Sequence, residues 1–377
     1  MVTAASVVVA VGAATGMITA LEDRDGTDEA RPSVTNSPSL DPAPVVPPSP
    51  PASPTPAERG RLSGSPVPKA SARPTATAPA AGRTRAPAAS GRLYRNPSSQ
   101  VLDWVRANPG DPRASVIRSR IAEQPAAVWF TDSRRDTIAS RVRAVTSGAA
   151  AQGRVPVLVV YAIPERDCGG ASEGGAPDLD SYDAWIDGFA AGLGSGEVIV
   201  VLEPDSIAQS ECLSADGRAA RFASLARAGR VLKSANPRAR VYYDAGHSGW
   251  HAASKQAALL RQAGAASAAS SDGIFSNVSN FHRTADEIVY DRAVLDALGG
   301  PAGLGAVIDT SRNGAGAPPD GEWCDPDGRK LGRTPTLSTG EARIDAYLWV
   351  KLPGESDGCK GEPGQFSPSY AYDLASS

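Results

Sequence analysis

Seven short apolar runs, separated by alanine-rich stretches, constrain this sequence more than any other feature. Each run ends at once in polar residues, glycine or proline; the runs cover residues 127–130, 155–161, 198–202, 241–243, 274–275, 306–308 and 347–350. The stretches between them, for example 181–193, 218–233 and 252–263, repeat apolar residues with the period of a helix. Alternating strands and helices predict an α/β fold with parallel strands, arranged as a barrel or as a doubly wound sheet.

The first 92 residues lack the composition of a folded domain. All tryptophan, tyrosine and phenylalanine residues lie at or beyond Tyr94, whereas 15 of the 32 prolines fall between Pro32 and Pro87. Residues 31–92 consist mainly of Pro, Ala, Ser and Thr, which bury too little apolar surface to offset the entropy of the chain. We therefore expect a disordered linker over 31–92 and one domain of catalytic size over 93–377.

Residues 1–30 are expected to direct the chain out of the cell. The first 20 residues carry no charge and contain the apolar stretch 6–11, as in the hydrophobic part of a secretory signal. The segment lacks the basic start of such a signal, and it also suits an uncleaved membrane anchor or a weakly apolar disordered end. The sequence thus predicts a secreted protein, with tethering through the N-terminus as an alternative.

Carboxylates recur where the predicted strands end, and the ends of parallel strands open on one face. The acidic residues at these positions are Asp167, Glu203, Asp205, Asp244, Asp309, Glu355 and Asp357. A single Asp after a strand is more often a helix cap or a turn former, and Asp244 and Asp309 suit that role best. Several carboxylates in one cleft raise one another's pKa, which supplies a protonated acid beside an ionised partner at neutral pH.

Tryptophans accompany these carboxylates. Trp129, Trp250 and Trp323 lie at or near the same predicted edge, and packing in the core is the alternative role for each. Indole rings beside Asp, Asn, Lys and Glu suit a sugar, which stacks on the rings and hydrogen-bonds through its hydroxyls. The formal net charge of −3 gives no basic surplus for binding nucleic acid. Carbohydrate is therefore the substrate class that these residues indicate.

The four cysteines all lie in the predicted domain, which agrees with an exported protein. Three pairings are possible. The spacing favours neighbours in sequence, Cys168 with Cys212 and Cys324 with Cys359, so that each disulfide ties a catalytic loop to its flank. Free buried thiols are the alternative. A zinc site is not expected, because the sequence has no Cys-x-x-Cys pair.

Six segments then carry a resemblance to a known family. In chain order they read VYAIPERDCG (160–169), VLEPD (201–205), YDAGHSGW (243–250), IDTSRNG (308–314), EWCDP (322–326) and LWVKLPGE (348–355). Together they resemble glycoside hydrolase family six, the secreted inverting cellulases, from about Asn96 to the end of the chain. The resemblance implies a distorted seven-stranded parallel β/α barrel that hydrolyses β-1,4-glucan with inversion and without a cofactor.

The resemblance also implies catalytic roles. Asp205 matches the general acid, which hands its proton to the glycosidic oxygen, and Asp167 matches the neighbouring carboxylate that shares this proton. Tyr161 would crowd the sugar at the cleavage point and favour a distorted ring. Asp357 matches the carboxylate usually proposed as the base, but Arg312 stands where it would pair with Asp357.

Three interpretations of the base therefore stay open. Asp357 is favoured as the base, a structural ion pair of Asp357 with Arg312 and Lys351 competes with it, and Ser172 could position a water chain instead. Substrate-binding positions also follow from the resemblance; they are Trp129, His247, Trp250, Asn280, Trp323, Lys351 and Glu355.

The mode of action follows from the length of one loop. The short span between Cys324 and Cys359 leaves no room for a tunnel, so we expect an open cleft and an endoglucanase. Exo action on the same substrate, or a carbohydrate-binding relative without turnover, are the alternatives. No protein partner is implied, and a monomer is expected.

Overall fold

The computed structural model describes residues 91–170 and 172–376 of the 377-residue chain. The predicted N-terminal segment 1–30 lies outside the described residues, as does the predicted linker except for its last two positions. Arg92 already belongs to a short strand, β1 (Arg92–Leu93), which pairs with β3 (Arg154–Val155). No helix within 91–376 has both the length and the apolar character needed to cross a membrane.

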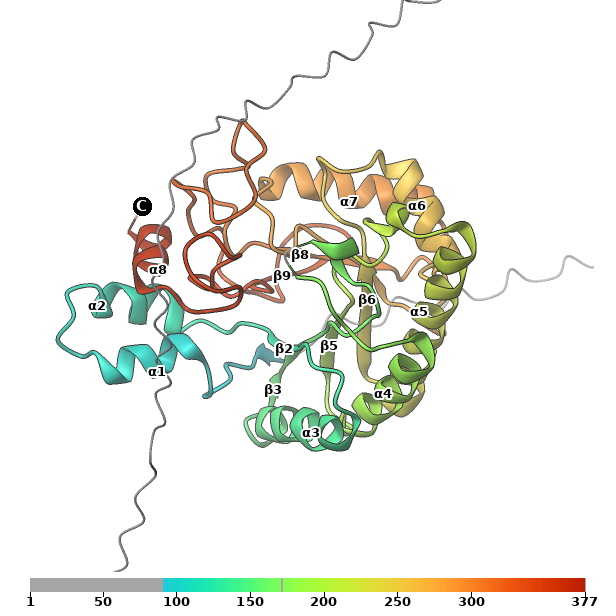
Figure 1. Ribbon diagram of the computed structural model, residues 1–377, viewed down its shortest axis with the longest axis horizontal. Coiled ribbons are helices and arrows are strands. Elements are labelled where there is room, and N and C mark those ends of the chain that lie inside the picture. Colours follow the sequence, from blue (N-terminus) through green and yellow to red (C-terminus); the bar gives the residue numbers. More distant parts are fainter. Residues whose placement is uncertain (1–90, 171, 377) are drawn as a thin grey trace, which may run out of the picture. The chain divides into compact units, whose positions relative to one another are not determined.

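A seven-stranded parallel sheet forms the centre of the domain (Figure 1). Its strands are β2 (Val128–Phe130), β4 (Val157–Val160), β5 (Val198–Leu202), β6 (Ala239–Asp244), β7 (Gly273–Ser276), β8 (Gly305–Asp309) and β9 (Ile344–Leu348). They pair in the order in which they occur along the chain, and every pair is parallel. This order excludes the doubly wound sheet, whose strand order reverses, and confirms the distorted barrel.

Helices surround the sheet on its outer side (Figure 1). The long ones are α3 (Arg135–Ala151), α4 (Leu179–Ala191), α5 (Ala215–Ala235), α6 (Ala253–Gln262) and α7 (Thr284–Leu298). A side-chain oxygen of Asp178 caps α4 and one of Ser214 caps α5, which explains why both helices begin where they do. The helices predicted from sequence at 181–193, 218–233 and 252–263 correspond to α4, α5 and α6.

Alternate residues of each strand enter two different cores. In β5, Val198, Val200 and Leu202 pack among the helices, whereas Ile199 and Val201 pack inside the curled sheet. All five are buried, because helices cover one face of the sheet and the barrel interior covers the other. This two-sided burial explains the continuous apolar runs in the sequence.

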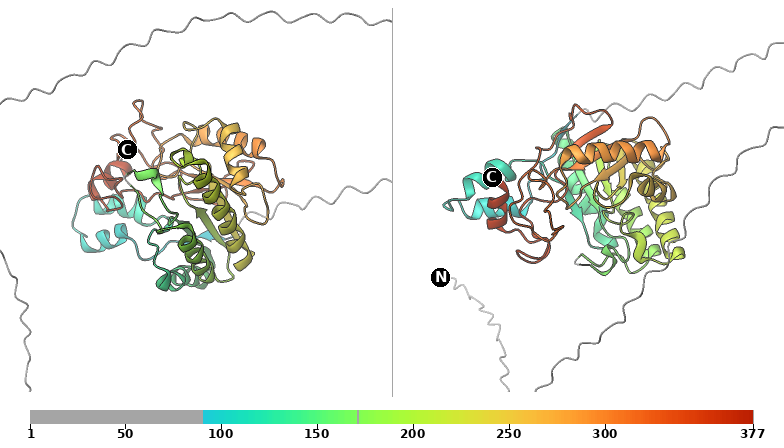
Figure 2. Two further views of the ribbon diagram at one scale, coloured as in Figure 1. Left: turned by 45° about the vertical axis from the view of Figure 1, so that its right-hand side comes forward. Right: turned by 90° about the horizontal axis from the view of Figure 1, so that it is seen from above.

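The sheet stays open between β2 and β9, the first and last strands in its order. The short helices α1 (Gln100–Ala107), α2 (Ala114–Ile117) and α8 (Pro368–Ala375) lie together beside this opening, with the π-helical turn η1 (Arg118–Ala122) (Figures 1 and 2). They pack around the buried ring of Trp349. The backbone N–H of Ala127 donates to the carbonyl of Trp349 at 2.9 Å, which links the two edges.

The last strand differs from its prediction at 347–350, because β9 ends at Leu348. Trp349 and Val350 are apolar and buried, but they lie beyond the ladder. The side chain of Asp309 accepts hydrogen bonds from the backbone N–H groups of Val350 and Lys351, in place of a strand partner. A carboxylate therefore ends this strand, and a pattern of apolar residues does not reveal that.

Candidate active site

A cleft of about 920 Å³ lies at the carboxyl ends of the strands. It collects every predicted catalytic and substrate-binding residue except Asp357. The predicted residues that line it are Trp129, Tyr161, Asp167, Ser172, Asp205, His247, Trp250, Asn280, Trp323, Lys351 and Glu355. They come from the carboxyl ends of all seven strands and the loops that follow, so the cleft depends on the whole sheet.

Asp205 lies in the turn that follows β5 and projects into the cleft. Its backbone has a φ of +70°, and that of Glu203 has a φ of +52°, so a strained turn presents the side chain. Burial, the Asp244 carboxylate and the Asp167 carboxylate raise the pKa of Asp205 well above its usual range. Among the described residues, no group hydrogen-bonds the Asp205 carboxyl. A protonated, unengaged acid therefore faces the cleft.

Three other strand-end carboxylates serve the backbone instead. Glu203 accepts hydrogen bonds from the N–H groups of Ala162 and Ile163, at the end of the neighbouring strand. Asp244 accepts from Ile207 and Ala208, in the turn that carries Asp205. Asp309 likewise accepts backbone hydrogen bonds, which confirms the structural role expected for Asp244 and Asp309. These carboxylates fix the strand ends that carry the reactive groups.

Asp167 is held by its own loop. One carboxylate oxygen accepts a hydrogen bond from the backbone N–H of Ser172 at 2.7 Å. A Cβ atom at Gly170 would lie 2.6 Å from the same oxygen, so only glycine leaves room for this contact. The Ser172 side chain lies close to Tyr161, whose pKa is raised by burial and by the carboxylates of Asp205 and Asp167. The Asp205 carboxyl, the Asp167 carboxylate, the Tyr161 phenol and Ser172 thus gather in one part of the cleft, where the charges of the two acids act on Tyr161.

Arg166 organises this loop, and sequence reasoning gave it no role. Its guanidinium donates to the carbonyls of Tyr161, Thr131 and Ser172 and lies 4.5 Å from the centre of the Tyr161 ring. The only feature of the sequence that points to Arg166 is its position next to Asp167 in the segment 160–169. The contacts themselves join residues up to 35 positions apart, so no local pattern predicts them.

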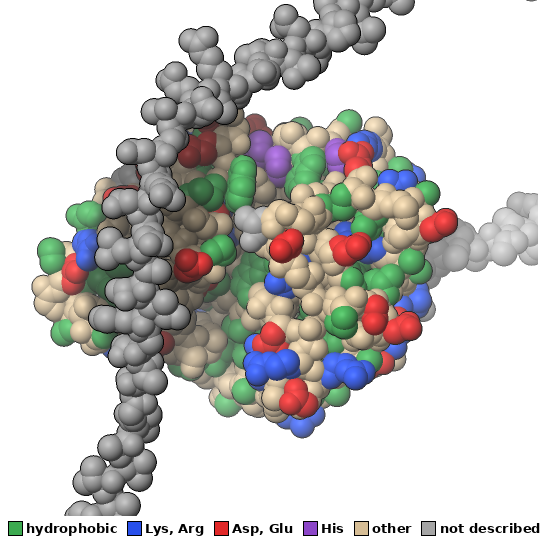
Figure 3. Space-filling model, viewed as in Figure 1, with side chains coloured by type: hydrophobic (Ala, Val, Ile, Leu, Met, Phe, Trp, Pro, Cys, Tyr) green, Lys and Arg blue, Asp and Glu red, His purple; other side chains and the backbone are tan. Residues whose placement is uncertain are grey.

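Two tryptophans and a histidine pair shape the walls of the cleft. The Trp129 indole N–H donates to the Val350 carbonyl at 2.7 Å, and its ring meets the edge of Tyr161. His247 packs near Trp250 and stacks on His282 with ring centres 4.2 Å apart. Figure 3 shows histidine side chains gathered beside hydrophobic ones on one face. His282 has no counterpart in the sequence-based predictions.

His247 lines the cleft as a neutral imidazole. Burial lowers the pKa of His247 to about 3, and the neighbouring His282 and His251 act in the same direction. Its Nδ1 atom accepts a hydrogen bond from the backbone N–H of Gly249 at 3.2 Å. The proton of the neutral ring therefore sits on Nε2. Within residues 91–170 and 172–376, no group of three or more His, Cys, Asp or Glu side chains could hold a metal ion.

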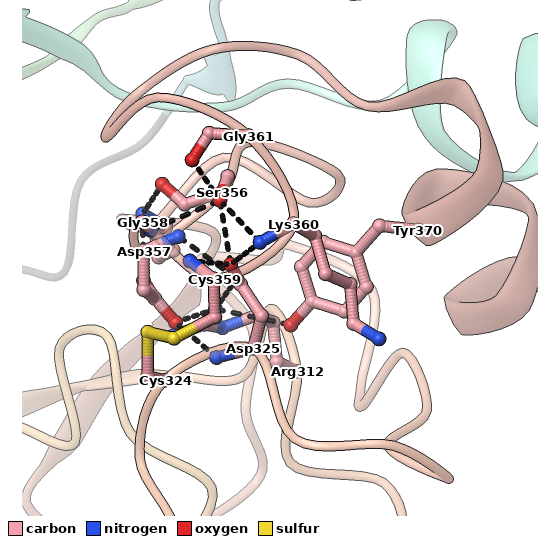
Figure 4. The surroundings of a disulfide bond; sticks show 11 residues. Arg312, Cys324, Asp325, Ser356, Asp357, Gly358, Cys359, Lys360, Gly361 and Tyr370 are labelled. Atoms are coloured by element: carbon pink, nitrogen blue, oxygen red, sulfur yellow. Dashed lines mark hydrogen bonds and ion pairs between the residues drawn. A yellow bond between two sulfur atoms is a disulfide. The ribbon is translucent and has the colours of Figure 1, made fainter. Parts of the chain in front are cut away.

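Asp357 lies outside the cleft lining and is paired with two cations, of which Figure 4 shows Arg312. One oxygen lies 2.6 Å from Arg312 and the other 2.8 Å from Lys351. The backbone N–H of Asp325 adds a hydrogen bond of 3.2 Å. The Arg312 side chain is fully buried and that of Asp357 is 8% exposed. Both carboxylate oxygens are thus engaged by charged partners within the protein.

Both predicted disulfides form, each between a cleft loop and its flank. Cys168–Cys212 joins the loop that carries Asp167 to the segment after Asp205. Cys324–Cys359 joins the loop that carries Trp323 to the segment after Asp357. No free cysteine remains in the described residues, so the alternative of buried thiols is excluded.

Glu203 gives the fold a predictable pH dependence. It is fully buried, and burial raises its pKa from 4.5 to about 7 despite the hydrogen bonds from Ala162 and Ile163. Its folded-state pKa exceeds its unfolded one, so the native state binds more protons and stability falls as pH rises from 4.5 to about 7. We expect Glu203→Gln, which keeps a hydrogen-bond acceptor, to flatten the fall of Tm across this window. An unchanged slope in a calorimetric pH series would contradict this.

Comparison with known proteins agrees with this geometry. The family model "Glycosyl hydrolases family 6" matches residues 88–375. Endoglucanase 1 of Streptomyces sp. (strain KSM-9) is 52% identical over 78% of this chain and 80% of its own length. Endoglucanase A of Thermobispora bispora is 49% identical over 75% of this chain and 61% of its own length.

A solved structure gives the same result. The endoglucanase Cel6 of Mycobacterium tuberculosis, in complex with methyl-cellobiosyl-4-deoxy-4-thio-β-D-cellobioside, is 40% identical to this chain. It superposes with a TM-score of 0.71 over 76% of this chain and 97% of that structure. A family model that covers the whole barrel, relatives at about half identity and a shared fold all agree, and the chain belongs to glycosyl hydrolase family 6.

Proposed function

We propose that this chain is an endo-β-1,4-glucanase that hydrolyses internal bonds of cellulose and related glucans with inversion at the anomeric carbon. One observation carries the proposal: a buried aspartic acid with a raised pKa, Asp205, faces a cleft lined by three tryptophans. The names of the relatives and the cellobioside bound to the Mycobacterium tuberculosis enzyme support the substrate class. The 55% exposure of Trp323 supports an open cleft rather than a tunnel.

The reaction needs one proton donor and one water. Asp205 gives its proton to the glycosidic oxygen while the bond from that oxygen to the anomeric carbon breaks. Water attacks the opposite face of the anomeric carbon and forms the new bond. The proton that this water loses passes to a carboxylate, and the enzyme returns it to Asp205 for the next cycle. The Trp129 and Trp323 rings hold the sugars beside the acid, and Tyr161 crowds the ring at the cleavage point.

Asp167 with Ser172 suits the role of receiving that proton. The Ser172 N–H holds the Asp167 carboxylate in the cleft wall, and the Ser172 hydroxyl reaches Tyr161 beside it. Asp357, by contrast, forms ion pairs through both of its carboxylate oxygens, one with Arg312 and one with Lys351. Two cations stabilise the carboxylate form and weaken it as a base. We therefore favour the water chain, with Asp357 as the anchor of the loop that carries Lys351.

We also propose that the protein works outside the cell. Two disulfides form within the described domain, and disulfides persist in oxidising compartments. The uncharged first 20 residues suit an export signal, and residues 31–92 suit a spacer between this segment and the domain.

The anomer of the first product tests the proposal. We expect proton NMR of a soluble β-1,4-glucan digest to show the α-anomer first, with the β-anomer appearing only by mutarotation. Viscosity should fall early, while few reducing ends have formed, because internal cuts shorten chains most. A β-anomer formed first would exclude inversion, and release of cellobiose without loss of viscosity would exclude endo action. A wild-type enzyme with no hydrolysis would leave only the carbohydrate-binding alternative.

A further inference from the structure

A second cavity of about 270 Å³ adjoins the cleft. Trp129, Leu352 and Glu355 line both cavities, so the two are direct neighbours that share these three side chains as their common boundary. Its remaining lining comes from the N-terminal part of the domain and from the segment before α8; it includes Asn96, Ser98, Gln100, Gln124, Trp349 and Phe366. The cavity therefore lies at the opening of the sheet between β2 and β9.

Gln100, the first residue of α1, fixes the boundary between the two cavities. Its side-chain N–H₂ donates to Glu355 at 2.9 Å and to the carbonyl of Gly364 at 2.8 Å. Its side-chain oxygen accepts a hydrogen bond from the backbone N–H of Phe366 at 3.0 Å. These three bonds join residues that lie at opposite ends of the domain sequence. Burial also raises the pKa of Glu355 to about 7, so this carboxyl can donate or accept a hydrogen bond near neutral pH.

Polar groups without protein partners line the rest of the small cavity. The half-buried Gln124 amide makes no hydrogen bond with any described residue, and neither does the Ser98 hydroxyl. Asn96 uses only its oxygen, which accepts from the backbone N–H of Ser98. A half-buried amide with free donors and acceptors next to an indole ring suits a sugar, whose hydroxyls bind the amide and whose apolar face packs on the ring.

We propose that this cavity is a further glucosyl-binding subsite, which holds the sugar unit that lies beyond Trp129 when a long glucan occupies the cleft. The inference rests on the proposed function, because an enzyme that cuts internal bonds must accommodate chain on both sides of the cut. Trp129 is shared between the two cavities and carries the chain from one to the other. Gln124 and Asn96 hydrogen-bond the hydroxyls of the added unit, and Gln100 holds Glu355 in place to do the same.

Gln124→Trp tests the subsite by filling it. Gln124 lines the small cavity but not the cleft, so the substitution removes the added unit and leaves the reacting centre intact. Wild-type kcat/KM measured from cellotriose to cellohexaose should rise by about tenfold at the length that first reaches the cavity, a step of about 1.4 kcal/mol. In Gln124→Trp this step disappears, while shorter substrates keep their wild-type values. Glu123→Trp is the matched control, because Glu123 is exposed and lines neither cavity, and it should keep the step.

Binding supplies a second readout that does not need turnover. Calorimetric titration of the Asp205→Asn enzyme with the same oligosaccharides should show the same step in affinity, and the added Gln124→Trp change should abolish it. The subsite would be overturned if Gln124→Trp lowered the affinity equally for oligosaccharides of every length, or if the step in affinity persisted in this variant. Wild-type protein that binds the series with the step but hydrolyses none of it would overturn the proposed function and leave the subsite standing.

Discussion

Asp205→Asn should lower kcat on a soluble cellulose derivative by about 10²–10⁴-fold, the usual contribution of a general acid. Asparagine matches the shape of the side chain but has no acidic proton for the glycosidic oxygen. The neighbourhood is already built for a neutral side chain, because burial and the carboxylates of Asp244 and Asp167 raise the pKa of Asp205. We therefore expect folding and substrate affinity to stay close to those of the wild type.

Comparing two substrates with different leaving groups tests whether Asp205 acts as the general acid. The dinitrophenolate of a dinitrophenyl cellobioside leaves without being protonated. The loss of kcat in Asp205→Asn should therefore be much smaller on this substrate than on cellulose. Asp103→Asn is the matched control, because Asp103 lies in an exposed ion pair with Arg106 and should leave both rates unchanged. Equal losses on the two substrates would mean that Asp205 does not protonate the leaving oxygen.

The strands could be predicted from sequence because helices and barrel interior bury both of their faces. Every residue of β4 and β5 is buried, so a continuous apolar run marks each strand without ambiguity. The pattern of apolar residues predicted the wrong strand end where a side chain, and not a neighbouring strand, binds the backbone. Trp349 and Val350 continue the apolar run beyond β9, but Asp309 binds the backbone of Val350 and ends the strand.

The candidate site was predictable where residues follow strands directly. Asp205 comes three residues after the end of β5 and Asp167 seven residues after the end of β4, so the parallel topology brings both loops to one rim. Gln100 could not be placed in this way. It lies 255 residues from Glu355, on a short helix that packs only because the sheet stays open between β2 and β9. Long-range contacts of this kind depend on how the segments around α1 and α8 pack together, which no local pattern encodes.

Asp357→Asn should lower the free energy of unfolding by about 3–5 kcal/mol and Tm by roughly 10 °C. The change leaves the fully buried Arg312 and the nearly buried Lys351 without their shared counter-ion. Arg312 then keeps only the more distant Asp325, at 3.8 Å, and Lys351 keeps the attraction of the Glu355 carboxyl. Arg312→Gln breaks the same ion pair from its other side and should cost a similar amount. Chemical denaturation of both variants measures these losses.

Catalysis by the same variant decides between an anchor and a base. If Asp357 anchors its loop, kcat measured well below the lowered Tm should fall by less than about tenfold, since the water chain through Ser172 and Asp167 is intact. A base would instead contribute about 10²–10⁴-fold. Azide would then restore turnover and give an α-glycosyl azide, because this anion attacks without losing a proton. A large loss of kcat that azide restores, in a variant as stable as the wild type, would return the role of base to Asp357.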